Sequence, residues 1–221
     1  MFKTPIWITN FKNEETSVGI NALELAKIHE KVAKEYNISI AVCVSALDIF
    51  RISKEVSIPV FAQHIDPIDY GKFTGHILPQ NVRKAGAVGT LLNHSEKRLP
   101  FEILQHSVSC AQKANLARIV CTESPDEVLE FSQFSPDFLA FEPPELIGSS
   151  SKSVSSENPE SIKKSVEVSQ GIPILVGAGI NSQEDIKVAL DLGAKGFLAA
   201  TAIIKSPDPE KSLKKFIEVF V

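Results

Sequence analysis

Polar side chains that could take part in catalysis follow several short apolar runs of this sequence, at the points where a buried strand would end. They are Asn10, Lys12, His94 and Glu142. A glutamate shielded by a loop has the surroundings that raise a carboxyl pKa and make it a general base near neutral pH. A histidine can donate a hydrogen bond to a carbonyl, and a lysine can bind phosphate or stabilise an enolate oxygen. These residue types form a coherent set for proton transfer beside a carbonyl group.

Each of these side chains also has a purely structural interpretation. Glu142 can be an exposed strand-end glutamate paired with a lysine, and Lys12 can be a solvated lysine. His94 can be a structural or solvated loop histidine. The residue types by themselves leave these alternatives open.

A glycine-rich segment, Gly177-Ala178-Gly179, follows another apolar run and opens a predicted helix near Asn181. Small residues let backbone N–H groups approach an anion, and a helix N-terminus favours negative charge. Barrel enzymes often bind phosphate with the loops after strands seven and eight. The segment therefore predicts a phosphate site, with a simple tight turn as the alternative.

The elements that must position these residues form a regular alternation of short apolar runs and amphipathic stretches. The runs that predict strands are Ile6–Thr9, Ser39–Val44, Val60–Gln63, Val88–Leu92, Arg118–Cys121, Phe138–Phe141, Ile174–Val176 and Gly196–Ala199. Helices are predicted between them, for example over Val18–Tyr36 and Ser182–Leu192. Ser124 followed by Pro125 is typical of a helix start.

Strands that alternate with helices indicate a parallel sheet, and nearly continuous apolar runs indicate strands buried on both faces. Eight units in 221 residues are compatible with a closed barrel of compact size. An open doubly wound sheet is the alternative, but a glycine-rich first turn is missing where Asn10-Phe11-Lys12 stands. We therefore predict the α/β class, with a (β/α)8 TIM barrel as a single domain over residues 1–221.

Composition narrows the classes of function. The net charge is −4 and no basic block suggests nucleic-acid binding. No apolar run reaches the ~18 residues that suggest a membrane span, and the N-terminus has no signal-peptide pattern. The cysteines Cys43, Cys110 and Cys121 form no CxxC pair, and the histidines and carboxylates lack metal-ligand spacing. We expect a cytoplasmic protein without a metal or cofactor.

Three segments resemble the triosephosphate isomerase family. Asn10-Phe11-Lys12 is similar to its Asn-x-Lys motif, His94-Ser95-Glu96 to its His-Ser-Glu segment, and Phe141–Gly148 to its catalytic glutamate and hinged lid. The stretches similar to the archaeal branch in particular are Pro59–Pro67, Thr74-Gly75-His76 and Ala87–Glu96. The resemblance covers nearly the whole chain in order.

This resemblance implies an aldose–ketose isomerase that acts on triose phosphates in glycolysis and gluconeogenesis through an enediolate. Glu142 would be the base, His94 the electrophile, and Lys12 the cation that stabilises negative charge, with Asn10 helping to bind substrate. The residues that would hold the phosphate end are Ile147, Gly148, Gly179, Ala200 and Thr201. Thr201-Ala202 stands where many members have a Gly-Gly pair, a departure that concerns the phosphate contact.

The resemblance also implies a homo-oligomer, a dimer of dimers, in which Thr74 reaches a neighbouring subunit's site. The segment from His64 to Pro79 is long for a strand-to-helix connection, which usually takes about 2–6 residues. Its apolar side chains are Ile65, Ile68, Tyr70, Phe73 and Ile77. We expect them to need a second subunit, because a barrel interior is filled by its own strands.

Two other functions are compatible with the same barrel. A Schiff-base aldolase requires a nucleophilic lysine in an apolar strand interior, whereas Lys12 stands at a strand end beside Asn10. A non-catalytic phosphate-binding barrel would make the grouping of Lys12, His94 and Glu142 coincidental.

Overall fold

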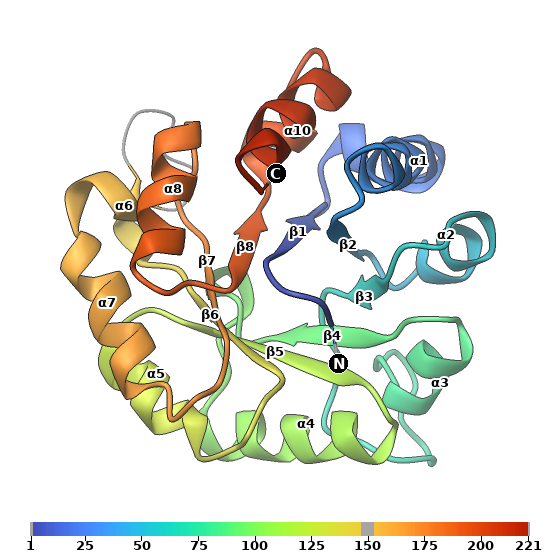
Figure 1. The fold of residues 1–221 in the computed structure, drawn as a ribbon. Coiled ribbons are helices and arrows are strands. Elements are labelled where there is room, and N and C mark those ends of the chain that lie inside the picture. Colours follow the sequence, from blue (N-terminus) through green and yellow to red (C-terminus); the bar gives the residue numbers. More distant parts are fainter. Residues whose placement is uncertain (1, 147–152, 221) are drawn as a thin grey trace.

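The computed structural model describes residues 2–146 and 153–220, and its strands close into a barrel (Figure 1). The strands are β1 (Ile6–Asn10), β2 (Ser39–Val44), β3 (Val60–Ala62), β4 (Gly89–Leu92), β5 (Ala117–Thr122), β6 (Phe138–Phe141), β7 (Ile174–Val176) and β8 (Gly196–Ala199). They pair in sequence order and in parallel, and β8 pairs with β1. The predicted closed (β/α)8 barrel is confirmed.

Helices surround the barrel as an outer ring (Figure 1). The α-helices are α1 (Gly19–Tyr36), α2 (Ile49–Glu55), α3 (Pro79–Lys84), α4 (Phe101–Lys113), α5 (Pro125–Ser132), α6 (Val154–Glu157), α7 (Pro159–Val168), α8 (Gln183–Asp191), α9 (Thr201–Ile204) and α10 (Pro209–Ile217). Short 3-10 turns are η1 (Glu15–Ser17), η2 (Ser95–Lys97), η3 (Pro144–Leu146) and η4 (Glu218–Phe220). In the described residues, no helix is long and apolar enough to cross a membrane.

Alternation along each strand divides the core into two clusters. On β1, Ile6 and Ile8 point into the barrel with Phe61 and Leu91, whereas Trp7 points outward. The Trp7 indole stacks on Phe216 of α10 with ring centroids 5.3 Å apart. The barrel interior is therefore packed with side chains, and space for a ligand remains only at its ends.

Helix starts follow the predicted capping chemistry. The hydroxyl of Ser124 accepts the N–H of Glu127 at 3.2 Å, and Pro125 occupies the first turn of α5. Asp208 caps α10 in the same way, with Pro209 next to it. These caps satisfy N–H groups that have no partner within the helix.

The segment after β6 contains η3 and α6, and Ser153 supplies a capping box at the start of α6. The expectation that the apolar side chains after β3 need a second subunit requires a correction. In the long segment after β3, Ile65 is fully buried and Ile77 packs on the same chain's core. Only Tyr70 and Phe73, at 62% and 44% exposure, are large apolar side chains left exposed there.

A buried histidine joins α1 to β1. His29 is fully buried, and its Nδ1 lies 2.8 Å from the carbonyl oxygen of Leu25. That contact assigns the hydrogen to Nδ1, so Nε2 accepts from the Thr9 hydroxyl at 2.8 Å. Thr9 in turn accepts the indole N–H of Trp7 at 2.9 Å. Both ring nitrogens of His29 therefore have a hydrogen-bond partner when the imidazole is neutral.

The His29 site predicts a loss of stability in mild acid. Burial lowers the pKa of His29 from 6.5 to about 4. Between these values the unfolded chain binds more protons, so the free energy of unfolding falls as pH drops below 6.5. From pH 6.5 to 5 we expect a loss of about 1–2 kcal/mol from this group in urea titrations. His29→Gln should remove that part of the pH dependence.

The matched control is His106→Gln, which changes an exposed histidine on α4. It should leave the pH dependence of unfolding as in the parent. If the free energy of unfolding changes with pH equally in the His29→Gln and His106→Gln variants, the prediction of a neutral buried His29 is wrong.

Candidate active site

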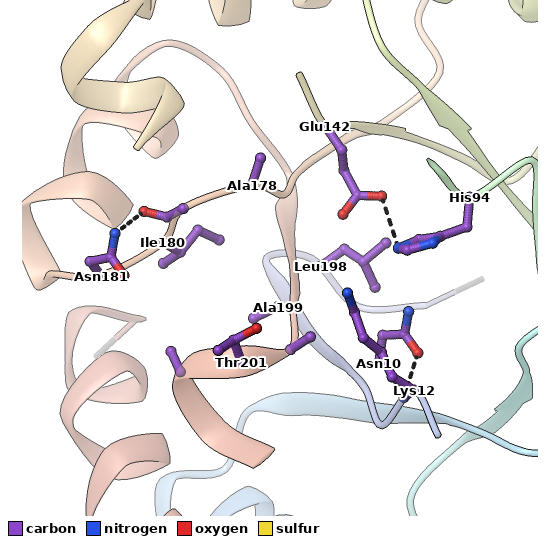
Figure 2. A pocket seen from close by; sticks show the side chains of 13 residues that line it. Asn10, Lys12, His94, Glu142, Ala178, Ile180, Asn181, Leu198, Ala199 and Thr201 are labelled. Atoms are coloured by element: carbon purple, nitrogen blue, oxygen red, sulfur yellow. Dashed lines mark hydrogen bonds and ion pairs between the residues drawn. The ribbon is translucent and has the colours of Figure 1, made fainter. Parts of the chain in front are cut away.

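A cavity of about 150 Å³ opens at the carboxyl ends of the strands (Figure 2). The predicted site residues that line it are Asn10, Lys12, His94, Glu142, Gly179, Ala200 and Thr201. They come from β1, β4, β6, β7 and β8 or from the turns that follow them. Ile147 and Gly148 lie outside the described residues. Thr74 is exposed in the segment after β3 and does not line this cavity.

Glu142 directly follows β6, and its backbone N–H donates to the carbonyl of Thr122 at 2.8 Å. Its carboxyl is buried, and its Oε2 atom has no hydrogen-bond partner among the residues that the structure describes. Burial raises the pKa of Glu142, whereas the neighbouring His94 and, less strongly, a hydrogen bond from the Cys121 thiol oppose part of that rise. The expected base thus has the desolvated surroundings that strengthen it, which excludes the alternative of an exposed surface glutamate.

A glycine makes room for this carboxylate. A Cβ atom at Gly177 would lie 2.5 Å from the Cγ atom of Glu142 and 2.6 Å from its Oε1 atom. Carbon atoms do not approach this closely, so any other residue at 177 would displace Glu142. Gly177, which the sequence placed in a predicted phosphate loop, therefore also provides the space for the Glu142 side chain.

His94 directs its Nε2 atom at Glu142 from across the cavity (Figure 2), with 3.8 Å between Nε2 and Oε2. Its Nδ1 atom accepts the backbone N–H of Glu96 at 3.3 Å. A neutral imidazole with Nδ1 as acceptor carries its hydrogen on Nε2. His94 is therefore arranged to donate a hydrogen bond into the cavity, and the alternative of a solvated loop histidine is excluded by its burial.

Lys12 has an unusual backbone conformation, with φ of 51°. A side-chain-bearing residue in the left-handed region costs about 1–2 kcal/mol, so its surroundings must hold it. The Asn10 side chain accepts the N–H of Lys12 at 3.0 Å, and the Gln63 side chain donates to its carbonyl at 2.8 Å. The Lys12 ammonium lies 2.8 Å from Glu96 Oε1.

The opposite side of the cavity is built from backbone and small side chains (Figure 2). Ala178 and Gly179 are both left-handed, with φ of 64° and 69°. The Asn181 side chain donates to the carbonyl of Gly179 at 2.7 Å. Ala200 and Thr201 complete this side at the start of α9. The cavity thus has a titratable end and an uncharged end.

Comparison with known proteins agrees with this geometry. The family model described as triosephosphate isomerase matches residues 5–219. The chain belongs to the triosephosphate isomerase family.

Two relatives named triosephosphate isomerase cover almost the whole chain. The protein of Methanobacterium bryantii is 46% identical over 96% of this chain and 95% of its own length. The protein of Saccharolobus solfataricus is 44% identical over 97% of this chain and 96% of its own length. A crystal structure of triosephosphate isomerase from Bartonella henselae has a TM-score of 0.71 at 20% identity and covers 98% of both chains, which shows the shared fold. The archaeal relatives agree with the resemblance read from the sequence.

A buried glutamate and a buried histidine thus face each other in this site. Three further residues of this site, Gln63, Glu96 and Cys121, were not predicted to have a role. The role of Cys121 was not predictable from the sequence, because its contact with Glu142 joins two different strands. In the described residues, no group of three or more potential ligands could hold a metal ion.

Gly177→Ala should lower kcat at least tenfold while the barrel stays folded. The added methyl group displaces the carboxylate, and small displacements of a reacting group can cost about 10²-fold in rate. Isomerase assays and circular dichroism would measure both properties. A folded Gly177→Ala variant with kcat within threefold of the parent would show that the position of Glu142 is not critical.

Proposed function

We propose that this chain interconverts dihydroxyacetone phosphate and D-glyceraldehyde 3-phosphate by proton transfer through an enediolate. Family membership supports the substrate and the reaction type. We further propose that residues 1–221 act as one domain, in the glycolysis and gluconeogenesis of the cytoplasm. The three cysteines are free and buried, which fits a reducing compartment.

Glu142 is the proposed base that removes the carbon-bound proton. A carboxylate is a stronger base when it is desolvated, and burial of Glu142 acts in that direction. Within the described part of the chain its Oε2 atom has no hydrogen-bond partner, and it faces the cavity side on which His94 lies, so a substrate carbon placed there meets an oxygen without a hydrogen bond. The proposal for Glu142 rests on this buried Oε2 atom and its place beside the cavity.

His94 and Lys12 are the proposed stabilisers of the enediolate. Negative charge grows on the substrate oxygens as the proton leaves, and donors fixed beforehand stabilise that charge most in the transition state. The Nε2–H of His94 donates to these oxygens, and a neutral imidazole also suits transfer of a proton between them. The Lys12 ammonium adds a full positive charge on the same side of the cavity.

The uncharged end of the cavity is the proposed phosphate site. Gly179, Ala200 and Thr201 contribute backbone groups there, and Asn10 helps to bind substrate beside Lys12. Ile147 and Gly148 are proposed to contribute from the segment after Glu142. Contacts to the phosphate supply binding energy that can position the reacting carbons and exclude water.

A coupled isomerase assay tests the reaction itself, and Glu142→Gln tests its base. We expect kcat to fall by about 10²–10⁴-fold or more, because the amide cannot take up the proton. The exposed Glu145 lies three residues on, and Glu145→Gln is the matched control, expected within threefold of the parent. A Glu142→Gln variant that keeps kcat within a factor of three would show that another group is the base.

The same substitution should not destabilise the protein. Because the pKa of Glu142 is raised on folding, its contribution to stability is lost as pH rises through that raised pKa. An amide removes this loss, so Tm near neutral pH is expected at or above that of the parent. Loss of activity together with loss of Tm would mean that unfolding explains the result.

We also propose that the chain works as a homo-oligomer, with a dimer of dimers as the form that the archaeal resemblance implies. The segment after β3 is held at its base, where the Asp66 side chain accepts the N–H of Ile77 at 2.6 Å. Its tip leaves Tyr70 and Phe73 exposed beside Thr74. A second cavity of about 650 Å³ adjoins Lys12 and is a suitable receptor for this tip from a neighbouring copy.

Replacing residues 68–75 with a short Gly-Ser turn should give monomers with strongly reduced kcat. The change keeps Asp66 and Ile77 and removes no residue with a proposed catalytic role in its own subunit. Sedimentation velocity would measure assembly, and circular dichroism would confirm that the barrel is folded. A monomer with full activity would contradict the proposal that association completes the site.

A further inference from the structure

A buried carboxylate on α8 binds the turn that forms the uncharged end of the cavity. Asp185 is 9% exposed, and its Oδ2 atom accepts the backbone N–H of Asn181 at 3.0 Å and that of Ser182 at 2.8 Å. Asn181 itself lines the cavity. One carboxylate oxygen therefore fixes two consecutive peptide units at the point where the turn after β7 enters α8.

The second oxygen of Asp185 binds a different part of the chain. Its Oδ1 atom accepts the hydroxyl of Ser153 at 2.5 Å. Ser153 caps α6, so it is itself held by the start of that helix. The two oxygens thus join the segment that follows the β6 loop to the turn that follows β7, although 32 residues separate Ser153 from Asp185.

The turn that Asp185 binds needs such support. Ala178 and Gly179 both have positive φ, and for Ala178, which carries a side chain, such a conformation persists only where the surroundings determine it. The side chain of Asn181 holds the carbonyl of Gly179 from within the turn. The Asp185 carboxylate, which lies on α8, accepts the backbone N–H groups of Asn181 and Ser182. No comparable charged group lies on this side of the cavity lining, among the residues that the structure describes.

We propose that Asp185 is a positioning residue for the phosphate end of the site, one that acts by fixing the backbone of residues 179–182. This inference rests on the proposed function, because it assigns the phosphate to that end. Asp185 does not line the cavity, so it acts through this backbone. Without it, the two N–H groups lose their acceptor and the Ser153 hydroxyl loses its contact with α8, so the turn can leave the geometry that an anion requires.

A comparison of substrates with and without phosphate isolates this effect. For Asp185→Ala we expect kcat/KM for D-glyceraldehyde 3-phosphate to fall at least tenfold, and the inhibition constant of inorganic phosphate to rise by a similar factor. Proton exchange of D-glyceraldehyde, which has no phosphate, should stay within threefold of the parent when followed by NMR. General destabilisation would lower both activities alike.

Three further variants complete the test. Asp185→Asn keeps an oxygen that can accept both N–H groups and should restore most of the phosphate-dependent activity. Asp185→Glu keeps the charge but moves the acceptors, so it should show the loss even if the Asp185→Ala variant does not fold. Ser155→Ala is the matched control, since this hydroxyl donates at 2.8 Å to the backbone carbonyl of Asp185 and does not contact its carboxylate.

The outcomes separate this inference from the proposed function. If the Asp185→Ala and Asp185→Glu variants bind inorganic phosphate as tightly as the parent, or lose both activities equally, Asp185 has no positioning role. If the parent shows no isomerase activity, the proposed function fails. Phosphate binding by the parent and by the Asp185 variants then still decides whether this carboxylate shapes an anion site.

Discussion

The site depends on the burial of one carboxylate whose Oε2 atom has no hydrogen-bond partner in residues 2–146 and 153–220. Placing Glu142 in this position is unfavourable for folding, since a buried carboxylate without full hydrogen bonding is costly. The two packed clusters of the barrel supply the apolar burial that offsets this cost. The same desolvation makes Glu142 a stronger base, so the unfavourable burial and the proposed catalytic property have one cause.

Three neighbours surround this carboxylate. Gly177 provides the space, whereas His94, with Nε2 at 3.8 Å from Oε2, and the Cys121 thiol oppose only part of the rise in the pKa of Glu142. A strong donor in place of any of them would stabilise the charged form and weaken the base. The composition of this environment, a glycine, a thiol and a neutral imidazole, is therefore as important as the glutamate itself.

Backbone conformation explains how side chains from separate strands meet. Lys12, Asn93 and Ala178 all have positive φ, and each follows or ends a different strand at the cavity. A left-handed residue turns the chain sharply at the strand end, so the side chains around it are directed into the cavity instead of away from it. Asn93 is held by its own side chain, which donates to Cys121 O at 3.0 Å and accepts from Leu99 N at 2.9 Å. Residues with positive φ thus lie at several strand ends around the site, and side-chain hydrogen bonds hold the chain at Lys12 and Asn93.

Much of this arrangement was predictable because it depends on local patterns. Strand runs, helix caps and the position of polar residues at strand ends are properties of short segments, and they located the barrel and the cavity residues. Pairwise contacts between distant segments were not predictable. The run that contains Cys121 reads only as a buried strand, and Asp185 reads only as a capping residue in the first turn of a helix. Likewise, the pattern around Ile65 shows that it is apolar but not which subunit buries it.

The pairing of Lys12 with Glu96 shows how charge is balanced in such a site. The Glu96 side chain is 59% exposed, whereas that of Lys12 is 16% exposed. Exposed ion pairs contribute only about 0–1 kcal/mol, because water stabilises the separated charges nearly as well. A fully buried partner would hold the ammonium far more strongly and leave a costly unpaired charge if it were displaced. An exposed carboxylate thus keeps Lys12 oriented at little cost, and under the proposed function an anionic substrate takes its place while water solvates Glu96.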